Sequence, residues 1–94
     1  MIYRIAIANV SAADIAKTLQ DVGFAGTLTA ALGFGQWGTE PTTVLECATD
    51  DGMKLLAAVR TLLFAHKEQA AYVTVDGRSP SLLWNDGRLT ALAA

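Results

Sequence analysis

Few side chains in this sequence have a type and spacing that could perform chemistry. The most specific pattern is Gly33-Phe34-Gly35-Gln36-Trp37-Gly38, which has the G-x-G-x-x-G spacing of phosphate-holding loops. In dinucleotide-binding domains this loop follows a strand and opens a helix whose N-terminus faces the pyrophosphate. Here Thr39-Glu40-Pro41 and a further strand follow, so we expect a glycine-rich turn between two strands and no dinucleotide site.

This turn is nevertheless the first candidate site, with Trp37 as its large aromatic side chain and Glu40 as its carboxylate. One interpretation is a bulged hairpin in which Trp37 covers the edge of the core. The other is a ligand or subunit contact, because glycines permit close backbone approach and tryptophan supplies a stacking face. The residues predicted to bind a ligand or form an interface here are Gly35, Gln36, Trp37, Gly38 and Glu40.

A second candidate group lies near the end of the sequence. Arg78 and Arg88 occupy predicted turn regions near Trp84. They could bind an anion together, or stay solvated as most exposed arginines do. We retain all three residues as predicted ligand-binding or interface positions.

Catalysis and metal binding have little support in the residues. Cys47 and His66 could form a nucleophile and base, but no third group is placed to orient the imidazole, which favours a buried structural thiol and a helix-end histidine. Asp50-Asp51 is explained by helix capping. Asn9-Val10-Ser11 lacks the arginine that an acylphosphatase-like phosphate loop would need. We therefore predict no enzyme activity, no metal site and no cofactor.

The elements that must position these groups can be read from apolar periodicity. Strands alternate apolar and polar residues, whereas Ile15, Leu19 and Val22 recur at helical spacing. The expected strands span residues 2–8, 27–34, 42–48 and 71–75. The expected helices run from Ser11 to Gly23 and from Gly52 to Ala65. An expected hairpin joins residues 81–84 to residues 88–92 around Asn85-Asp86-Gly87. We expect residues 76–80 to form a turn.

This order predicts an α+β fold, namely a ferredoxin-like β-α-β-β-α-β sandwich. It has an antiparallel sheet, two helices on one face and a C-terminal hairpin. The other face of the sheet is left open, and open faces of small proteins often associate or bind ligands.

Length and composition limit the class of protein. A length of 94 residues predicts a single domain over residues 1–94. The composition, with 52% hydrophobic and 17% charged residues, excludes a disordered or low-complexity chain. Seven Lys and Arg residues and a net charge of −2 argue against a nucleic-acid partner. One cysteine cannot form an intrachain disulfide. With no signal peptide and no membrane-length apolar stretch, we expect a cytoplasmic protein without membrane partners.

The apolar content is high for so small a domain, whose surface is large relative to its volume. The predicted core houses much of it, but Leu56, Leu63, Trp37, Trp84 and the open sheet face remain. This surplus predicts that the chain associates with itself or with a partner.

From Phe34 to Gly77 the chain resembles the trimeric PII-like and copper-tolerance-type proteins of ferredoxin-like fold. The resemblance lies in Trp37-Gly38-Thr39-Glu40, a strand over 43–47, the helix over 52–65 and a closing strand over 72–75. In such families this region builds trimer contacts and clefts between subunits that admit small ligands, often nucleotides. The resemblance implies cleft or interface roles for Trp37, Gly38 and Glu40 only.

These observations lead to two hypotheses from different classes. The first is a non-enzymatic homo-oligomer that takes a small ligand, such as a nucleotide, at a cleft between subunits. The alternative is a small interaction protein that docks on a larger protein partner, such as a phage-encoded inhibitor of bacterial defence. Compact size, mild acidity and exposed apolar surface suit the alternative equally well.

Overall fold

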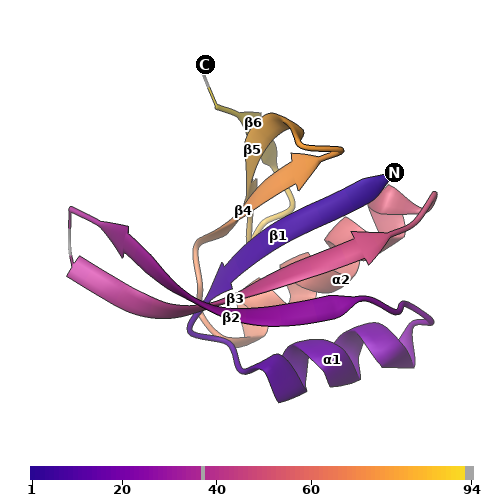
Figure 1. Ribbon diagram of the computed structural model, residues 1–94, viewed down its shortest axis with the longest axis horizontal. Coiled ribbons are helices and arrows are strands. Elements are labelled where there is room, and N and C mark those ends of the chain that lie inside the picture. Colours follow the sequence, from indigo (N-terminus) through magenta and orange to yellow (C-terminus); the bar gives the residue numbers. More distant parts are fainter. Residues whose placement is uncertain (37, 93–94) are drawn as a thin grey trace.

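The computed structural model describes residues 1–36 and 38–92. These residues form six strands and two helices (Figure 1). Their bounds are β1 Ile2–Ala8, α1 Ala12–Asp21, β2 Thr27–Gly35, β3 Gly38–Ala48, α2 Gly52–Ala65, β4 Ala70–Val75, β5 Arg78–Trp84 and β6 Leu89–Ala91. Within these residues, neither helix is long and apolar enough to cross a bilayer.

All six strands form one antiparallel sheet with the order β2-β3-β1-β4-β5-β6. The first strand of the chain therefore lies inside the sheet, between β3 and β4, and β2 and β6 form its two edges. An open antiparallel sheet with two helices is an α+β fold, as predicted. The sheet has six strands rather than the four of the simple sandwich, because the C-terminal hairpin extends it beyond β4.

The core lies between one face of the sheet and both helices. Alternate strand residues such as Ile5, Leu45 and Val73 are almost fully buried and pack in one cluster with the inward sides of α1 and α2. Because both helices contribute to this single cluster, they cover the same face of the sheet. The buried helix side chains are Ile15 and Leu19 in α1 and Leu55, Val59, Leu62 and Leu63 in α2.

The helix ends and turns follow their local signals. The Ser11 hydroxyl accepts a hydrogen bond from the Asp14 backbone N–H at 3.1 Å, and the Asp51 carboxylate accepts one from the Lys54 N–H at 3.3 Å. Gly23, with φ of +89°, follows the end of α1, and Gly87, with φ of +94°, closes the last hairpin. The expected caps and the expected hairpin turn are confirmed.

The expected antiparallel strand pair is present, but its strands extend farther into the glycine-rich segment than predicted. β2 continues to Gly35 and β3 begins at Gly38 rather than at Thr42, so the ladder runs on through the pair Leu32↔Pro41. The Pro41 carbonyl accepts a bond from the Asn9 backbone N–H at 2.9 Å. In a strand, the N–H and C=O of one residue point to the same side, so the donor that proline lacks faces the side where the ladder with β1 has ended.

Two further predictions are wrong. Residues 76–80 are not one turn, since β5 begins at Arg78 after a two-residue turn in which Asp76 and Gly77 both have positive φ. Such a turn matches the twist of the strands that it joins. Leu63 is not surplus apolar surface, because it is fully buried, and Leu56 packs partly against the same core.

Candidate functional site

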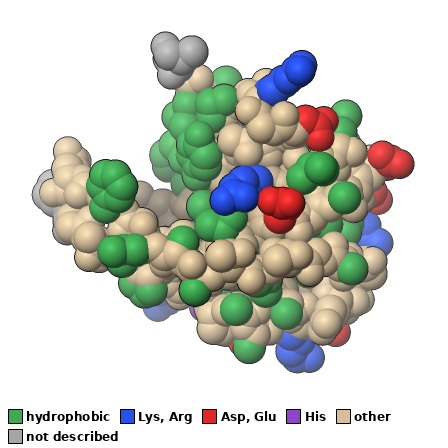
Figure 2. Space-filling view, in the orientation of Figure 1, with side chains coloured by type: hydrophobic (Ala, Val, Ile, Leu, Met, Phe, Trp, Pro, Cys, Tyr) green, Lys and Arg blue, Asp and Glu red, His purple; other side chains and the backbone are tan. Residues whose placement is uncertain are grey.

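The β2–β3 ribbon extends beyond the rest of the sheet, and we call its outer part, residues 32–41, the arm. Pairing of β1 with β3 ends at Ala8↔Thr42, whereas β2 and β3 stay paired out to Gly35↔Gly38. Figure 1 shows the arm projecting at the left of the molecule. Leu32 is 68% exposed and Phe34 is 90% exposed, and hydrophobic side chains stand out along the arm in Figure 2.

The arm carries the first predicted site. Gly35, Gln36, Gly38 and Glu40 all lie on it and are exposed. Trp37, the aromatic side chain of the prediction, lies outside the described residues. Phe34, Gly35, Gly38, Thr39 and Glu40 line a small hollow of about 200 Å³. The described part of the arm therefore offers an apolar ring, exposed backbone at Gly35 and Gly38 and one carboxylate.

Hydrogen bonds from Asn9 tie the base of the arm to the body. Its side-chain amide donates to Glu40 Oε2 at 2.9 Å and to Glu68 Oε1 at 3.0 Å, so one amide group bridges two carboxylates. Asn9 has a φ of +60°, a left-handed conformation that asparagine tolerates better than most residues. No local sequence pattern indicates this cluster, because its two carboxylates are 31 and 59 residues from Asn9 along the chain.

The second predicted group is only partly brought together. The Arg88 guanidinium lies 5.2 Å from the centroid of the Trp84 ring, and Arg88 Nε is 2.8 Å from Asp86 Oδ2. The backbone N–H of Arg88, followed by its guanidinium, lowers the pKa of the Asp86 carboxyl. The indole N–H of Trp84 donates to Thr90 Oγ1 at 3.0 Å. These contacts stabilise the β5–β6 hairpin, and in them the Arg88 guanidinium already has Asp86 and the Trp84 ring as partners.

Arg78 stands apart from this hairpin. It is the first residue of β5 and Trp84 is the last, so the length of the strand, about 20 Å at 3.3 Å per residue, separates them. The arm lies on β2 and β3, toward the opposite edge of the sheet from β5 and β6. A single copy of the chain therefore does not unite the arm, Arg78 and the Trp84–Arg88 pair in one site.

The two side chains considered for catalysis lie on different elements, Cys47 on β3 and His66 at the C-terminal end of α2. Cys47 is 1% exposed, and burial raises the pKa of its thiol, which disfavours the reactive thiolate. His66 caps the C-terminus of α2, and its Nε2 lies 3.7 Å from Asp14 Oδ2. Among the described residues, no three His, Cys, Asp or Glu side chains gather as a metal site would require. The expected buried thiol is confirmed.

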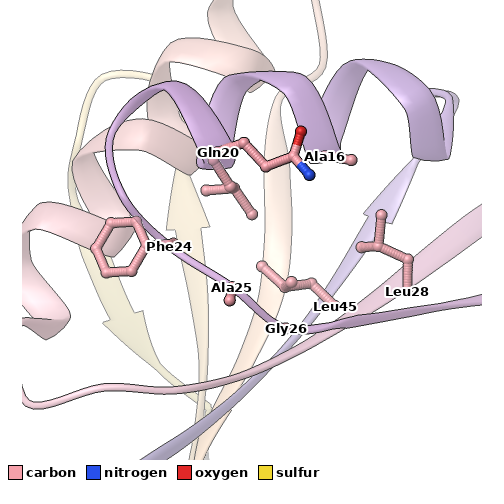
Figure 3. Close-up of a pocket in the computed structure, with 8 residues that line it drawn as sticks. Ala16, Gln20, Phe24, Ala25, Gly26, Leu28 and Leu45 are labelled. Atoms are coloured by element: carbon pink, nitrogen blue, oxygen red, sulfur yellow. The ribbon is translucent and has the colours of Figure 1, made fainter.

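An apolar groove between α1 and β2 was not predicted at all (Figure 3). It has a volume of about 170 Å³ and opens beside the edge strand. In Figure 3, Leu28 and Leu45 lie on the strand side, Gln20 and Ala16 on the α1 side, and Phe24 at one end. The residues lining it are Ala16, Leu19, Gln20, Phe24, Ala25, Gly26, Leu28 and Leu45. Leu19, Leu28 and Leu45 fit the apolar pattern of core elements, so periodicity alone could not distinguish a groove from a filled core.

Comparisons of the chain with models of protein families, with curated proteins and with solved structures found no match.

Proposed function

We propose that this protein is a non-enzymatic homo-oligomer that binds a small ligand, such as a nucleotide, in a cleft between subunits. The observation that carries the proposal is the arm with its exposed Leu32 and Phe34 side chains. An isolated two-stranded hairpin is marginally stable in water. A ribbon that extends beyond its sheet and exposes large apolar side chains gains stability when a neighbouring molecule covers it.

The chemistry of the arm limits how a ligand would bind there. Glu40 is the one charged residue of the sequence between Thr27 and Thr42. Its carboxylate would accept hydrogen bonds from hydroxyl or amino groups, and it would repel a phosphate. In our proposal a nucleotide therefore turns its ribose and base toward the arm, and the phosphate points away from Glu40.

The hollow of about 200 Å³ beside Glu40 is smaller than the 300–1,000 Å³ typical of ligand pockets. A second copy that covers the arm would add the missing walls. This is why we place the cleft between subunits rather than within one chain.

We further propose that the part of the chain from β1 to β4 is a ferredoxin-like unit to which β5 and β6 are added. In support, these four strands have the order β2-β3-β1-β4, and a helix follows β1 and β3. The two helices share one face, as such a sandwich requires.

The first experiment measures molar mass by size-exclusion chromatography with light scattering at micromolar concentration. We expect a mass above the 9.9 kDa of one chain. A clean monomer would contradict the proposal.

The second experiment is a thermal-shift comparison of adenosine, AMP and ATP. A ligand that binds only the folded state stabilises it by RT ln(1 + [L]/Kd), about 2.7 kcal/mol at a hundredfold excess over Kd. We expect a rise in melting temperature that is largest for adenosine and that is reduced in Glu40→Gln, which keeps the size of the side chain but removes its charge. The absence of a shift with every compound would contradict ligand binding while leaving self-association standing.

A second candidate function, docking on a larger protein, is favoured by a different surface. Met53 is 87% exposed and Leu89 is 53% exposed, and together with Leu56 they line an apolar groove of about 250 Å³ between α2 and the β5–β6 hairpin. A stoichiometric protein partner in a pull-down that is lost in Met53→Ser but kept in Phe34→Ser would favour docking through this groove. The reverse pattern would count against it.

A further inference from the structure

The outer edge of β2 is an unprotected strand edge. β2 is nine residues long, and no strand of the described residues pairs with its outer side, so backbone N–H and C=O groups of alternate residues face outward there. Natural proteins protect such edges with charged residues, proline, bulges or short strands. The stretch Thr27–Gly35 contains no charged residue and no proline, and its pairing with β3 is continuous. This edge has the properties of a strand that pairs with another chain.

A second copy of β2 is the strand that matches it best. The other edge of the sheet, β6, has only three residues, Leu89–Ala91, and could pair with a third of β2 at most. Two β2 strands have equal length and equal sequence. Two-fold symmetry, the commonest symmetry of soluble oligomers, makes such a surface self-complementary.

Backbone geometry restricts the register of this pairing. The outward groups of β2 belong to alternate residues, so an antiparallel two-fold pairing must be centred on a residue rather than between two residues. Centring on Ala31, the middle of β2, pairs all nine residues of each copy. Phe34 of one copy then lies opposite Leu28 of the other, on the face of the sheet that the helices cover.

Leu28 lines the groove between α1 and β2. The groove has a volume of about 170 Å³, close to the roughly 150 Å³ of an apolar cavity that accommodates benzene. Phe34 is 90% exposed in the single chain. The pairing therefore brings the most exposed aromatic ring of the described arm to an apolar groove of suitable size.

We propose that two copies of this chain pair antiparallel through their β2 edges, with the two-fold axis at Ala31, and that Phe34 of each copy enters the α1–β2 groove of the other. This rests on the proposed function, because it specifies the surface through which the homo-oligomer forms. The dimer has one continuous sheet of two copies, with all helices on one side of it.

The two Phe34 rings supply part of the area that a stable dimer needs. Aromatic side chains bury about 150–250 Å² each, so the two Phe34 rings supply about 300–500 Å² of the roughly 1,200–2,000 Å² found in stable interfaces. Leu32, which is 68% exposed, and the two paired edges supply further area. Each copy contributes both the ring and the groove.

Disulfide trapping tests the register. In an antiparallel pair, opposed Cα atoms lie about 4.5–5.5 Å apart, within the range that a disulfide spans. Ala31→Cys places two thiols opposite each other at the axis, so mild oxidation should convert most of the protein to a covalent dimer. The matched control is Thr29→Cys on the same face of β2, whose thiols would be four residues out of register and should remain uncrosslinked. Wild type controls for the buried Cys47.

Circular dichroism would detect a folding defect in Ala31→Cys. A second pair of variants tests the same register without changing Ala31. Ala30→Cys and Leu32→Cys oppose each other in this register, so a mixture of the two should crosslink and each alone should not. Equal crosslinking of Thr29→Cys and Ala31→Cys, or a folded dimer in which neither Ala31→Cys nor the mixture crosslinks, would overturn the inference. A trimer in light scattering would overturn the inference but not the proposed function, and a monomer would contradict both.

Discussion

Replacement of Phe34 by alanine is the most direct test of whether the arm is an interface. The ring is 90% exposed in one chain, so its loss should change the free energy of unfolding of a single copy by less than about 0.5 kcal/mol. Burial of a phenylalanine side chain stabilises by about 1.5–3 kcal/mol. A symmetric dimer buries two, which amounts to about 3–6 kcal/mol. At 1.4 kcal/mol per factor of ten, the dimer Kd should rise about 10²- to 10⁴-fold.

The matched control is Phe64→Ala on α2. Phe64 is 72% exposed and has the same side chain, but it does not belong to the arm or to the α1–β2 groove. Analytical ultracentrifugation across a dilution series gives the Kd of each variant, and denaturant unfolding gives its stability. We expect Phe34→Ala to shift the Kd and Phe64→Ala to leave it within a few-fold of wild type.

Two results would refute this reasoning. If both substitutions changed the Kd equally, exposed phenylalanines would act without regard to position, and the arm would have no special role. If Phe34→Ala dimerised as tightly as wild type, the ring would not be buried in the assembly, and its exposure would need another explanation.

Three further outcomes follow from single contacts. Gly52→Ala should destabilise the fold by about 1–3 kcal/mol in denaturant unfolding, because the added methyl overlaps the hydroxyl and ring of Tyr3, whereas a methyl at Gly35 meets no atom of the described residues within 4 Å and Gly35→Ala should cost less than 1 kcal/mol. Cys47 should resist a thiol reagent at pH 8 in the native protein and react once the chain is denatured, since burial raises its pKa; rapid native labelling would contradict its burial. The Asp86 pKa is lowered in the folded state, so its contribution to stability is present above the unfolded pKa and lost as the pH falls through the folded pKa. An NMR titration should show this lowered pKa rising toward its usual range in Arg88→Ala, and an unchanged value would show that the arginine side chain has no part in the shift.

The features predictable from the sequence are those that depend on neighbouring residues. Ser11 caps α1 and Gly87 closes the last hairpin because a hydroxyl and a backbone without Cβ act within a few residues of their own position. Alternation identified the buried faces of β1, β3 and β4 for a similar reason, whereas the apolar residues that alternate along the outer part of β2 are exposed. The α+β class follows from the order of these local elements.

The arm shows why other features could not be predicted. Pro41 and the glycines around it are typical of a break in a strand. Pro41 would interrupt the sheet only where a second neighbouring strand needed a hydrogen bond from its backbone N–H. The ladder with β1 ends at Thr42, so Pro41 meets no such requirement. Whether the pairing of β1 extends as far as Pro41 depends on the whole sheet, so no local sequence pattern can predict it.

The candidate site could also be predicted only where its residues are close in sequence. Gly35, Gln36, Gly38 and Glu40 were located together because they are close in sequence. The bridge from Asn9 to Glu40 and the α1–β2 groove depend on how separate elements dock. Arg78 and Trp84 seemed close in sequence terms, but an extended strand lies between them and keeps them apart.

The position of β1 inside the sheet determines the order in which the chain can fold. Ile2 pairs with Ala48 on one side, and Tyr3 pairs with Val75 on the other, so its partners leave the ribosome long after it does. The β2–β3 ribbon has a tight connection and can form within microseconds, whereas contacts distant in sequence form slowly. During synthesis the ribbon and β1 are therefore expected to be available before β4, the second neighbour of β1, has left the ribosome. In that interval the sheet is incomplete and has unpaired strand edges, and the nascent chain is most exposed to aggregation and to exchange of strands with a neighbour.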